Sequence, residues 1–149
     1  MVNSTPVMLM VDDDEQDIYF TRRAFLSEMP ELIFDSVSNG AELFDYLNRE
    51  GKYRDIPHRS TLPVLLLDIN MPRENGFDIL RKLRKDPDHY SLGVVMLSTS
   101  VSEVDISNAY AAGANSYICK SINANGMKTI ATCFCEYWFG LAKLPGRSR

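Results

Sequence analysis

The chain has 149 residues, which is enough for one domain with a proper hydrophobic core and too few for two full domains. Apolar residues make up 45% of it and charged residues 24%, and no apolar stretch approaches the roughly 20 residues that a membrane span requires. The formal net charge is -4, whereas a nucleic-acid surface needs clustered Lys and Arg. We therefore expect one soluble domain over 1–149, with its core at about 6–140 and a tail at 141–149, that binds neither membranes nor nucleic acids.

Targeting signals and disulfides are not apparent. The first residues, Met1 to Pro6, lack the basic region and the apolar core of a secretory signal, so we expect a cytoplasmic protein. The cysteines Cys119, Cys133 and Cys135 are an odd number without the spacing of a zinc site. We expect all three to be reduced thiols in the core.

Apolar runs and helical patterns alternate from the N-terminus onwards. The run 6–11 predicts a strand, and apolar residues at helical spacing over 18–29 predict a helix. Residues 32–37 predict a second strand, which a helix around 43–47 follows. The polar segment 50–63 has no apolar period and predicts a long loop. Further strands are expected at 64–67, 94–97 and 116–119, and further helices at 77–83, 104–112 and 127–138.

This regular alternation predicts an α/β fold. Five such units with right-handed crossovers give a parallel sheet with helices on both faces. Runs such as Val64 to Leu67 are apolar throughout, which is typical of strands buried on both faces of a parallel sheet. A flavodoxin-like, doubly wound five-stranded sheet with the order 2-1-3-4-5 fits the length, although the alternation alone does not determine that order.

Polar side chains follow four of the five expected strands. In open α/β sheets, ligands bind beyond the carboxyl ends of the strands, so these side chains should lie close together. They are Asp12 and Asp13 after the first strand, Asp68 after the third, Ser98 and Thr99 after the fourth, and Lys120 after the fifth.

This set of side chains predicts a phosphoryl site with a bound cation. Three carboxylates drawn together repel one another, and oxygen ligands suit Mg²⁺ better than zinc. A lysine and a hydroxyl can surround phosphoryl oxygens while a carboxylate acts as the nucleophile. We expect Asp68 to be that nucleophile because it stands alone after a fully apolar strand, whereas Asp12 and Asp13 are paired as metal ligands would be.

Each of these residues also has a simpler interpretation. The acids from Asp12 to Asp17 could be the solvated start of a helix that Asp14 caps. A calcium loop is excluded, because it would need Gly at position 17 and Glu at position 23, where Asp17 and Arg23 stand. Asp68 alone could cap a helix, and Lys120 alone could be a solvated charge. Tyr117 on pattern alone is a half-buried strand residue. Only the combination of these side chains, each directly after a different strand, favours a functional site over the simpler interpretations.

Four segments carry a resemblance to a known family. They are Met10-Val11-Asp12-Asp13, Leu66 to Pro72 with Gly76, Leu97-Ser98-Thr99, and Tyr117-Ile118-Cys119-Lys120. Each alone is a weak pattern, but all of them in order after the expected strands are specific. From about Pro6 to Trp138, the chain resembles the receiver domain of response regulators in two-component systems.

The resemblance implies a chemical role for each acid. Asp68 would take a phosphoryl group from a histidine kinase, in a reaction that requires Mg²⁺. Asp13 would bind the metal directly, Asp12 partly through water, and the main-chain carbonyl of Asn70 would complete the protein ligands. Such a domain catalyses only its own phosphorylation and slow dephosphorylation, so it is a switch and not an enzyme with turnover.

The resemblance also implies how the signal leaves the site. Lys120 would pair with the phosphoryl group, and Ser98 would move to hydrogen-bond it and draw Tyr117 inward. The surface around the fourth helix, fifth strand and fifth helix would then change. A downstream phosphotransfer or effector protein, or a second copy of the chain in a homodimer, would dock there.

One position departs from the family pattern. Proline usually follows the lysine, commonly in a cis bond, and this sequence has Ser121. A cis bond before a non-proline residue costs about 3 kcal/mol, so whether the Lys120–Ser121 bond is cis stays open. Lys-Ser here, the long loop before Pro63 and the aromatic final helix with Trp138 resemble stand-alone receivers that serve phytochrome-type kinases.

Two alternative functions remain. A Mg²⁺ phosphohydrolase of the haloacid dehalogenase type would use Asp12 as nucleophile and Asp14 as acid, but it expects Thr or Val where Gln16 stands and a late acidic pair beyond Lys120. A receiver-like module that only binds partners would not need every site residue, and here every one is present.

Overall fold

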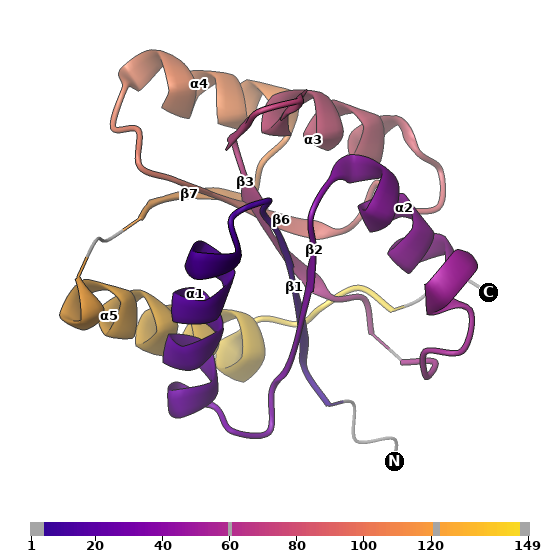
Figure 1. Cartoon of the computed structure of the whole chain (residues 1–149), viewed down its shortest axis with the longest axis horizontal. Coiled ribbons are helices and arrows are strands. Elements are labelled where there is room, and N and C mark those ends of the chain that lie inside the picture. The colour runs from indigo at the N-terminus through magenta and orange to yellow at the C-terminus, as the bar shows by residue number, and fades with distance from the viewer. Residues whose placement is uncertain (1–4, 60, 121–122, 147–149) are drawn as a thin grey trace.

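Five strands form one parallel sheet in the computed structural model, which describes residues 5–59, 61–120 and 123–146 (Figure 1). The strands are β1 (Val7–Val11), β2 (Ile33–Val37), β3 (Val64–Asp68), β6 (Gly93–Ser98) and β7 (Ser116–Cys119). Their order is β2-β1-β3-β6-β7, and every neighbouring pair is parallel. Counted over these five strands, this is the order 2-1-3-4-5, so the expected flavodoxin-like fold is confirmed.

Helices cover both faces of the sheet, as Figure 1 shows. Two of them, α1 (Glu15–Glu28) and α5 (Ala124–Cys135), pack together on one face. The opposite face carries α2 (Gly40–Asn48), α3 (Gly76–Lys85) and α4 (Glu103–Ala112).

The core consists of two apolar layers separated by the sheet. Met8 and Met10 of β1 face the layer that contains Phe25 of α1 and Phe134 of α5. Leu9 and Val11 of the same strand face the layer that α2, α3 and α4 cover. Every residue of β1, β3 and β6 is buried, because a strand within a doubly covered sheet presents both of its faces to helices.

Side-chain caps determine where several helices begin. Asp14 precedes α1, and its carboxylate accepts hydrogen bonds from the backbone N–H groups of Gln16 and Asp17 at 2.9 and 3.4 Å. Asn75 caps α3 in the same way through the N–H of Phe77 at 2.7 Å. The cap on α1 places Asp17 in the first helical turn, at the end of the helix that is next to the carboxyl edge of the sheet.

Short elements appear where the sequence predicted only turns or loops. Asn70–Met71 (β4) and Glu74–Asn75 (β5) form a two-residue antiparallel pair, and a 3₁₀ turn, η1 (Gly51–Tyr53), lies within the expected long loop. Elements of two or three residues are too short to show an apolar period, so sequence pattern does not reveal them.

The expected tail packs against the domain. Helix α5 continues into a π-helical turn, η2 (Glu136–Leu141), and beyond it the carbonyl of Pro145 accepts a hydrogen bond from the N–H of Leu62 at 3.0 Å. Thr61 and Gly146 form an isolated antiparallel bridge. The described part of 141–149 is therefore tied to the segment before β3, a backbone contact that side-chain pattern could not predict.

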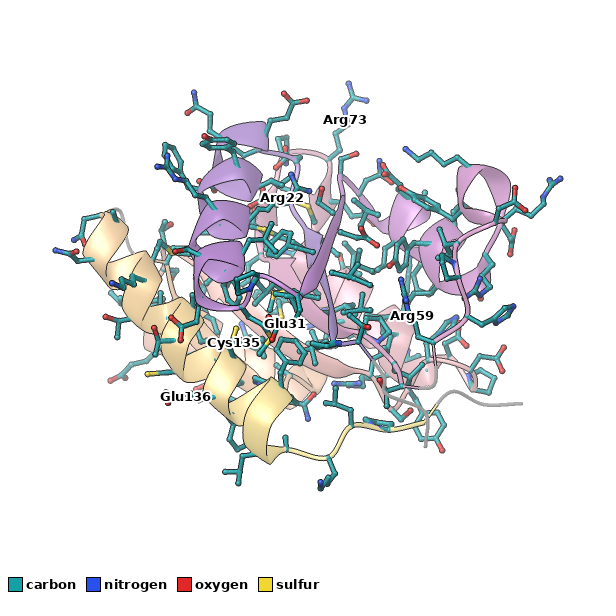
Figure 2. The ribbon with its side chains drawn as sticks, turned by 90° about the horizontal axis from the view of Figure 1, so that it is seen from below. Arg22, Glu31, Arg59, Arg73, Cys135 and Glu136 are labelled. Atoms are coloured by element: carbon teal, nitrogen blue, oxygen red, sulfur yellow. The ribbon has the colours of Figure 1, made fainter. Side chains whose placement is uncertain are left out.

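The prediction that all three cysteines are core thiols is wrong for two of them. All three are free, and only Cys135 is buried. Its side chain lies on the inner side of α5, whereas Glu136 next to it is exposed (Figure 2). Cys133 lies two residues earlier on the helix and faces solvent, and Cys119 ends β7, the edge strand of the sheet.

None of the described helices is long and apolar enough to cross a membrane.

Gly76 lets α3 approach the end of β3. Its N–H donates to the carbonyl of Ile69 at 2.9 Å, and a β-carbon at this position would overlap the carbonyl oxygen of Asp68 and lie 2.8 Å from the α-carbon of Ile69. We expect Gly76→Ala to lower the free energy of unfolding by about 1–3 kcal/mol in urea denaturation, because backbone must shift to admit the methyl group. A matched Gly140→Ala change, where the nearest atom is 3.8 Å away, should cost less than about 1 kcal/mol. Equal stability of the two variants would contradict this close packing.

Candidate functional site

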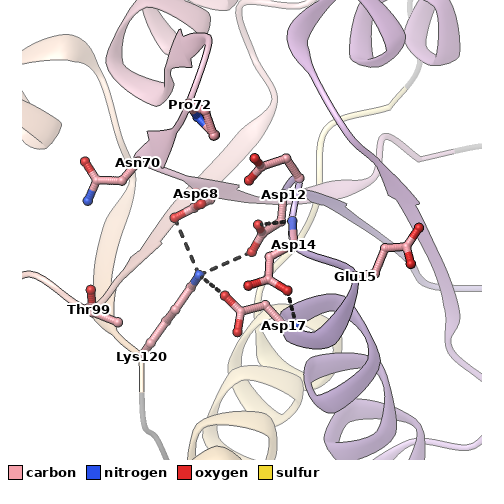
Figure 3. Close-up of a pocket in the computed structure, with 10 residues that line it drawn as sticks. Asp12, Asp14, Glu15, Asp17, Asp68, Asn70, Pro72, Thr99 and Lys120 are labelled. Carbon is pink, nitrogen blue, oxygen red and sulfur yellow. Dashed lines mark hydrogen bonds and ion pairs between the residues drawn. The ribbon is translucent and has the colours of Figure 1, made fainter.

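A polar hollow opens at the carboxyl edge of the sheet, where the sequence predicted a site. It is lined by Asp12, Asp13, Asp14, Glu15, Asp17, Asp68, Asn70, Pro72, Thr99 and Lys120 (Figure 3). The ends of β1 and β3 contribute the central acids, the start of α1 contributes one wall, and the end of β7 contributes the lysine. The expected convergence of strand ends is thus present in the structure.

Three carboxylates form a cluster within this hollow. One oxygen each of Asp12, Asp13 and Asp68 lies within 4.8 Å of the other two. Asp12 is fully buried and Asp68 is 7% exposed, while Asp13 faces solvent. The donors are all carboxylate oxygens, and a hard divalent cation takes such ligands in preference to zinc, so the residues present fit a cation of the magnesium type.

The ionised forms of Asp12 and Asp68 are disfavoured when the protein holds no cation. Burial raises the pKa of Asp68 to about 6, even though the charge of Lys120 opposes that shift, and the neighbouring Asp12 charge adds to it. Burial also raises the pKa of Asp12, against the hydrogen bond that Asp12 accepts from the N–H of Asp14 at 3.0 Å. A further positive charge in the hollow would relieve both groups.

Lys120 is the ammonium that partly compensates these acids. Its Nζ lies 3.2 Å from an oxygen of Asp12, 3.5 Å from one of Asp68 and 2.8 Å from one of Asp17 (Figure 3). Burial alone would lower the pKa of Lys120, but the hydrogen bond to Asp17 and the three negative charges raise it, so the side chain stays protonated. Its backbone N–H donates to the carbonyl of Ser98 at 2.7 Å, which holds the residue at the end of the sheet.

Asp17 is a site residue that the sequence did not identify. It belongs to the acidic run after β1, but no role followed from the pattern. The 2.8 Å contact with Lys120 joins residues that lie 103 positions apart, so it exists only because the fold brings the start of α1 to the end of β7. The only signal in the sequence was an acid in the first turn of the helix that follows the first strand.

Ser98 and Tyr117 lie outside the hollow and are linked to each other through Ser100. Ser98 is fully buried, and its hydroxyl oxygen accepts a hydrogen bond from the N–H of Ser100 at 3.1 Å. The hydroxyl of Tyr117 donates to the carbonyl of Ser100 at 2.8 Å, and its ring packs against the core layer beneath α4. Ser98 and Tyr117 are therefore connected by hydrogen bonds to the backbone of one shared residue, Ser100.

Asn70 and Thr99 line the hollow as expected. Asn70 belongs to β4, and its side chain points away from Asp68 in Figure 3, while its backbone N–H hydrogen-bonds the Asp68 carboxyl group. Ser121, and with it the Lys120–Ser121 bond, lies outside the described residues.

The comparison with known families agrees with this geometry. The family model of the response regulator receiver domain matches residues 8–132, which include every acid of the cluster and Lys120. The chain belongs to this family. It is therefore a receiver of the two-component type, a signalling domain that accepts a phosphoryl group.

Several receivers resemble this one over almost their whole length. The response regulator Rcp1 of Synechocystis sp. is 25% identical over 143 residues, which are 96% of this chain and 95% of that protein. The structure of the phosphorylated cyanobacterial phytochrome response regulator RcpA is 31% identical with a TM-score of 0.83, covering 95% of this chain and 99% of that one. A response regulator in red light signaling of R. palustris is 30% identical with a TM-score of 0.85, over 94% and 98% of the two chains.

The phosphohydrolase alternative loses its support at this receiver site. Its nucleophile would be Asp12, which is fully buried and paired with Lys120. Its acid would be Asp14, whose carboxylate accepts the two hydrogen bonds that cap α1. A group that already caps a helix is poorly placed to donate a proton to a leaving group.

Substitution of Asp68 should stabilise the receiver when no metal is present. Since the pKa of Asp68 in the fold is about 6, above the value of about 3.9 in an unfolded chain, its ionised form destabilises the fold. This destabilisation of the fold by Asp68 is absent below about pH 4, grows as the pH rises to about 6 and is constant above about pH 6. In chelator at pH 7.5 we expect Asp68→Asn to raise the free energy of unfolding by roughly 1–3 kcal/mol, with the gain shrinking as the pH falls to 4.

Asp88→Asn serves as the control for this measurement, because Asp88 is exposed in the turn after α3. Its free energy of unfolding should change by less than about 0.5 kcal/mol. An Asp68→Asn protein that is less stable than the parent at pH 7.5 would contradict the electrostatic description of the site.

Proposed function

We propose that Asp68 is the residue of this receiver that accepts the phosphoryl group. The observation that carries the proposal is the position of its carboxylate, at the end of the central strand β3, beside the acids of β1 and 3.5 Å from the Lys120 ammonium. Asp68 is 7% exposed, so it keeps some access to the hollow, whereas Asp12 is fully buried. A nucleophile that must meet a large donor needs that access.

The proposed transfer requires one bond to form and one to break. A carboxylate oxygen of Asp68 forms an O–P bond while the N–P bond of a phosphohistidine on the kinase breaks, and the electron pair of that bond returns to the imidazole nitrogen. Lys120 has the charge and the position to neutralise the phosphoryl oxygens as they arrive. The product is an acyl phosphate on β3, whose later hydrolysis would be the only other reaction of the chain.

Asp12, Asp13 and Asp68 are proposed to hold Mg²⁺, with the main-chain carbonyl of Asn70 as a further ligand. The grouping of three carboxylate oxygens within 4.8 Å supports a divalent cation at this place. So does the solved Mn²⁺-bound form of the relative Rcp1, which has a TM-score of 0.79 and is 25% identical. A bound divalent cation would neutralise charge on the phosphoryl oxygens.

Ser98 and Tyr117 are proposed to carry the signal away from Asp68. In the present arrangement the Ser98 hydroxyl is bonded to the N–H of Ser100, and the Tyr117 hydroxyl to the carbonyl of the same residue. If Ser98 turns towards the phosphoryl group, it must release the Ser100 N–H. The segment that holds Tyr117 then loosens, so the ring is free to move inward.

The partner of the proposed reaction is a histidine kinase of the phytochrome type. Its support is the similarity to the cyanobacterial and bacteriophytochrome response regulators. We place the exchange in the cytoplasm and treat residues 1–149 as one receiver domain. The face made by α4, β7 and α5 is proposed to bind a downstream phosphotransfer or effector protein or a second copy of the chain, supported by Val104 and Tyr110 of α4, which are 67% and 51% exposed.

Intact-mass spectrometry after incubation with acetyl phosphate tests the assignment of Asp68. We expect the parent chain to gain the mass of one phosphoryl group with Mg²⁺ present and little without it, because the clustered acids repel an anionic donor. Asp68→Asn should gain none, and Asp88→Asn should behave as the parent. If Asp68→Asn still gained the mass, the nucleophile would lie elsewhere, and a parent chain that never gained it would be a binding module.

A further inference from the structure

The shortest contact of the Lys120 ammonium is with an acid outside the carboxylate cluster. Nζ lies 2.8 Å from Asp17, compared with 3.2 Å from Asp12 and 3.5 Å from Asp68. Asp12 and Asp68 belong to the group whose oxygens lie within 4.8 Å of one another, together with Asp13. Among the described residues, Asp17 is thus the carboxylate partner of Lys120 that is not also placed to bind a cation.

The Lys120 ammonium and a divalent cation would compete for the carboxylates of Asp12 and Asp68. An ammonium and a divalent cation repel each other, and both would use the carboxylate oxygens of these two acids. When those oxygens serve as metal ligands, Lys120 loses most of its attraction to them. Its side chain is a flexible four-carbon stem, which the repulsion could drive out of the hollow into solvent. Lys120 needs another negative partner if it is to stay beside Asp68.

We infer that Asp17 is a positioning residue for phosphoryl transfer, which holds the Lys120 ammonium beside Asp68 when Asp12 and Asp68 are engaged by a cation. The inference rests on the proposed roles of Asp68 and Lys120. Lys120 is then held at two points, through its backbone N–H on the carbonyl of Ser98 and through its ammonium on α1. Asp17 itself is placed by the Asp14 cap, which accepts a hydrogen bond from its backbone N–H.

The neighbouring acids on the same wall cannot replace Asp17. Asp14 is occupied as the helix cap. Glu15 also lines the hollow, but its carboxylate points away from Lys120 in Figure 3. Glu15 therefore offers a matched control, since Glu15→Gln removes the same charge from the same wall without touching the lysine. The side chain of Asp17 is 42% exposed, so its loss should not unfold the protein.

The first test measures phosphorylation by acetyl phosphate at saturating Mg²⁺, so that metal affinity does not limit the rate. We expect Asp17→Asn to slow the reaction about tenfold, because the lysine is no longer held in position. Asp17→Glu, which keeps the carboxylate on a longer arm, should recover part of the rate, and Glu15→Gln should stay within about twofold of the parent. Equal slowing in Asp17→Asn and Glu15→Gln would show a general charge effect and overturn the inference, as would an unchanged rate in Asp17→Asn.

The second test does not depend on phosphorylation. The ammonium nitrogen and hydrogens of Lys120 can be followed by NMR, with the signal assigned by its loss in Lys120→Gln. On addition of Mg²⁺ alone, we expect the signal to persist in the parent and in Glu15→Gln, and to disappear through fast exchange with water in Asp17→Asn. Persistence of the signal in Asp17→Asn would overturn the inference. A parent chain that cannot be phosphorylated would instead refute the proposed function, and the NMR result would still decide the role of Asp17.

Discussion

Burial of several carboxylates at one edge of the sheet is the constraint on which the rest of this structure depends. Parallel strands end at the same edge, so the acids that follow β1 and β3 meet whether or not their charges favour it. Burial is the largest cause of the raised pKa values of Asp12 and Asp68, and for Asp68 the neighbouring Asp12 charge adds to this unfavourable ionisation. One ammonium, Lys120, offsets part of it, and its position between three carboxylates makes the site responsive to any further positive charge.

The surrounding fold holds these charges in place. Gly76 allows α3 to pack against the end of β3, so the backbone that carries Asp68 is supported directly. The short β4–β5 pair places Asn70 at the rim, and the carbonyl of Ser98 anchors the backbone of Lys120. Ser98 also connects to Tyr117 through Ser100, which gives the site a path of hydrogen bonds towards the surface around α4.

The sequence predicted those features that depend on strand ends and apolar period. Asp12, Asp68 and Lys120 could be placed together because each directly follows an apolar run, and the layered α/β architecture followed from the alternation. Asp17 could not be placed, since its contact with Lys120 depends on the fold bringing the start of a helix close to the end of a strand far along the chain. The bridge between Thr61 and Gly146 was missed for a similar reason, because backbone pairing leaves no trace in side-chain pattern.

Proton release on Mg²⁺ binding tests the electrostatic account most directly. It can be measured by titration calorimetry in two buffers with different heats of ionisation. Since the pKa of Asp68 is about 6 in the metal-free fold, and a carboxylate must be deprotonated to act as a ligand, binding at pH 6 should release on the order of half a proton. At pH 8 it should release almost none. The same proton count at both pH values, or no Mg²⁺ binding at either, would contradict a site built from buried acids that lack sufficient positive charge.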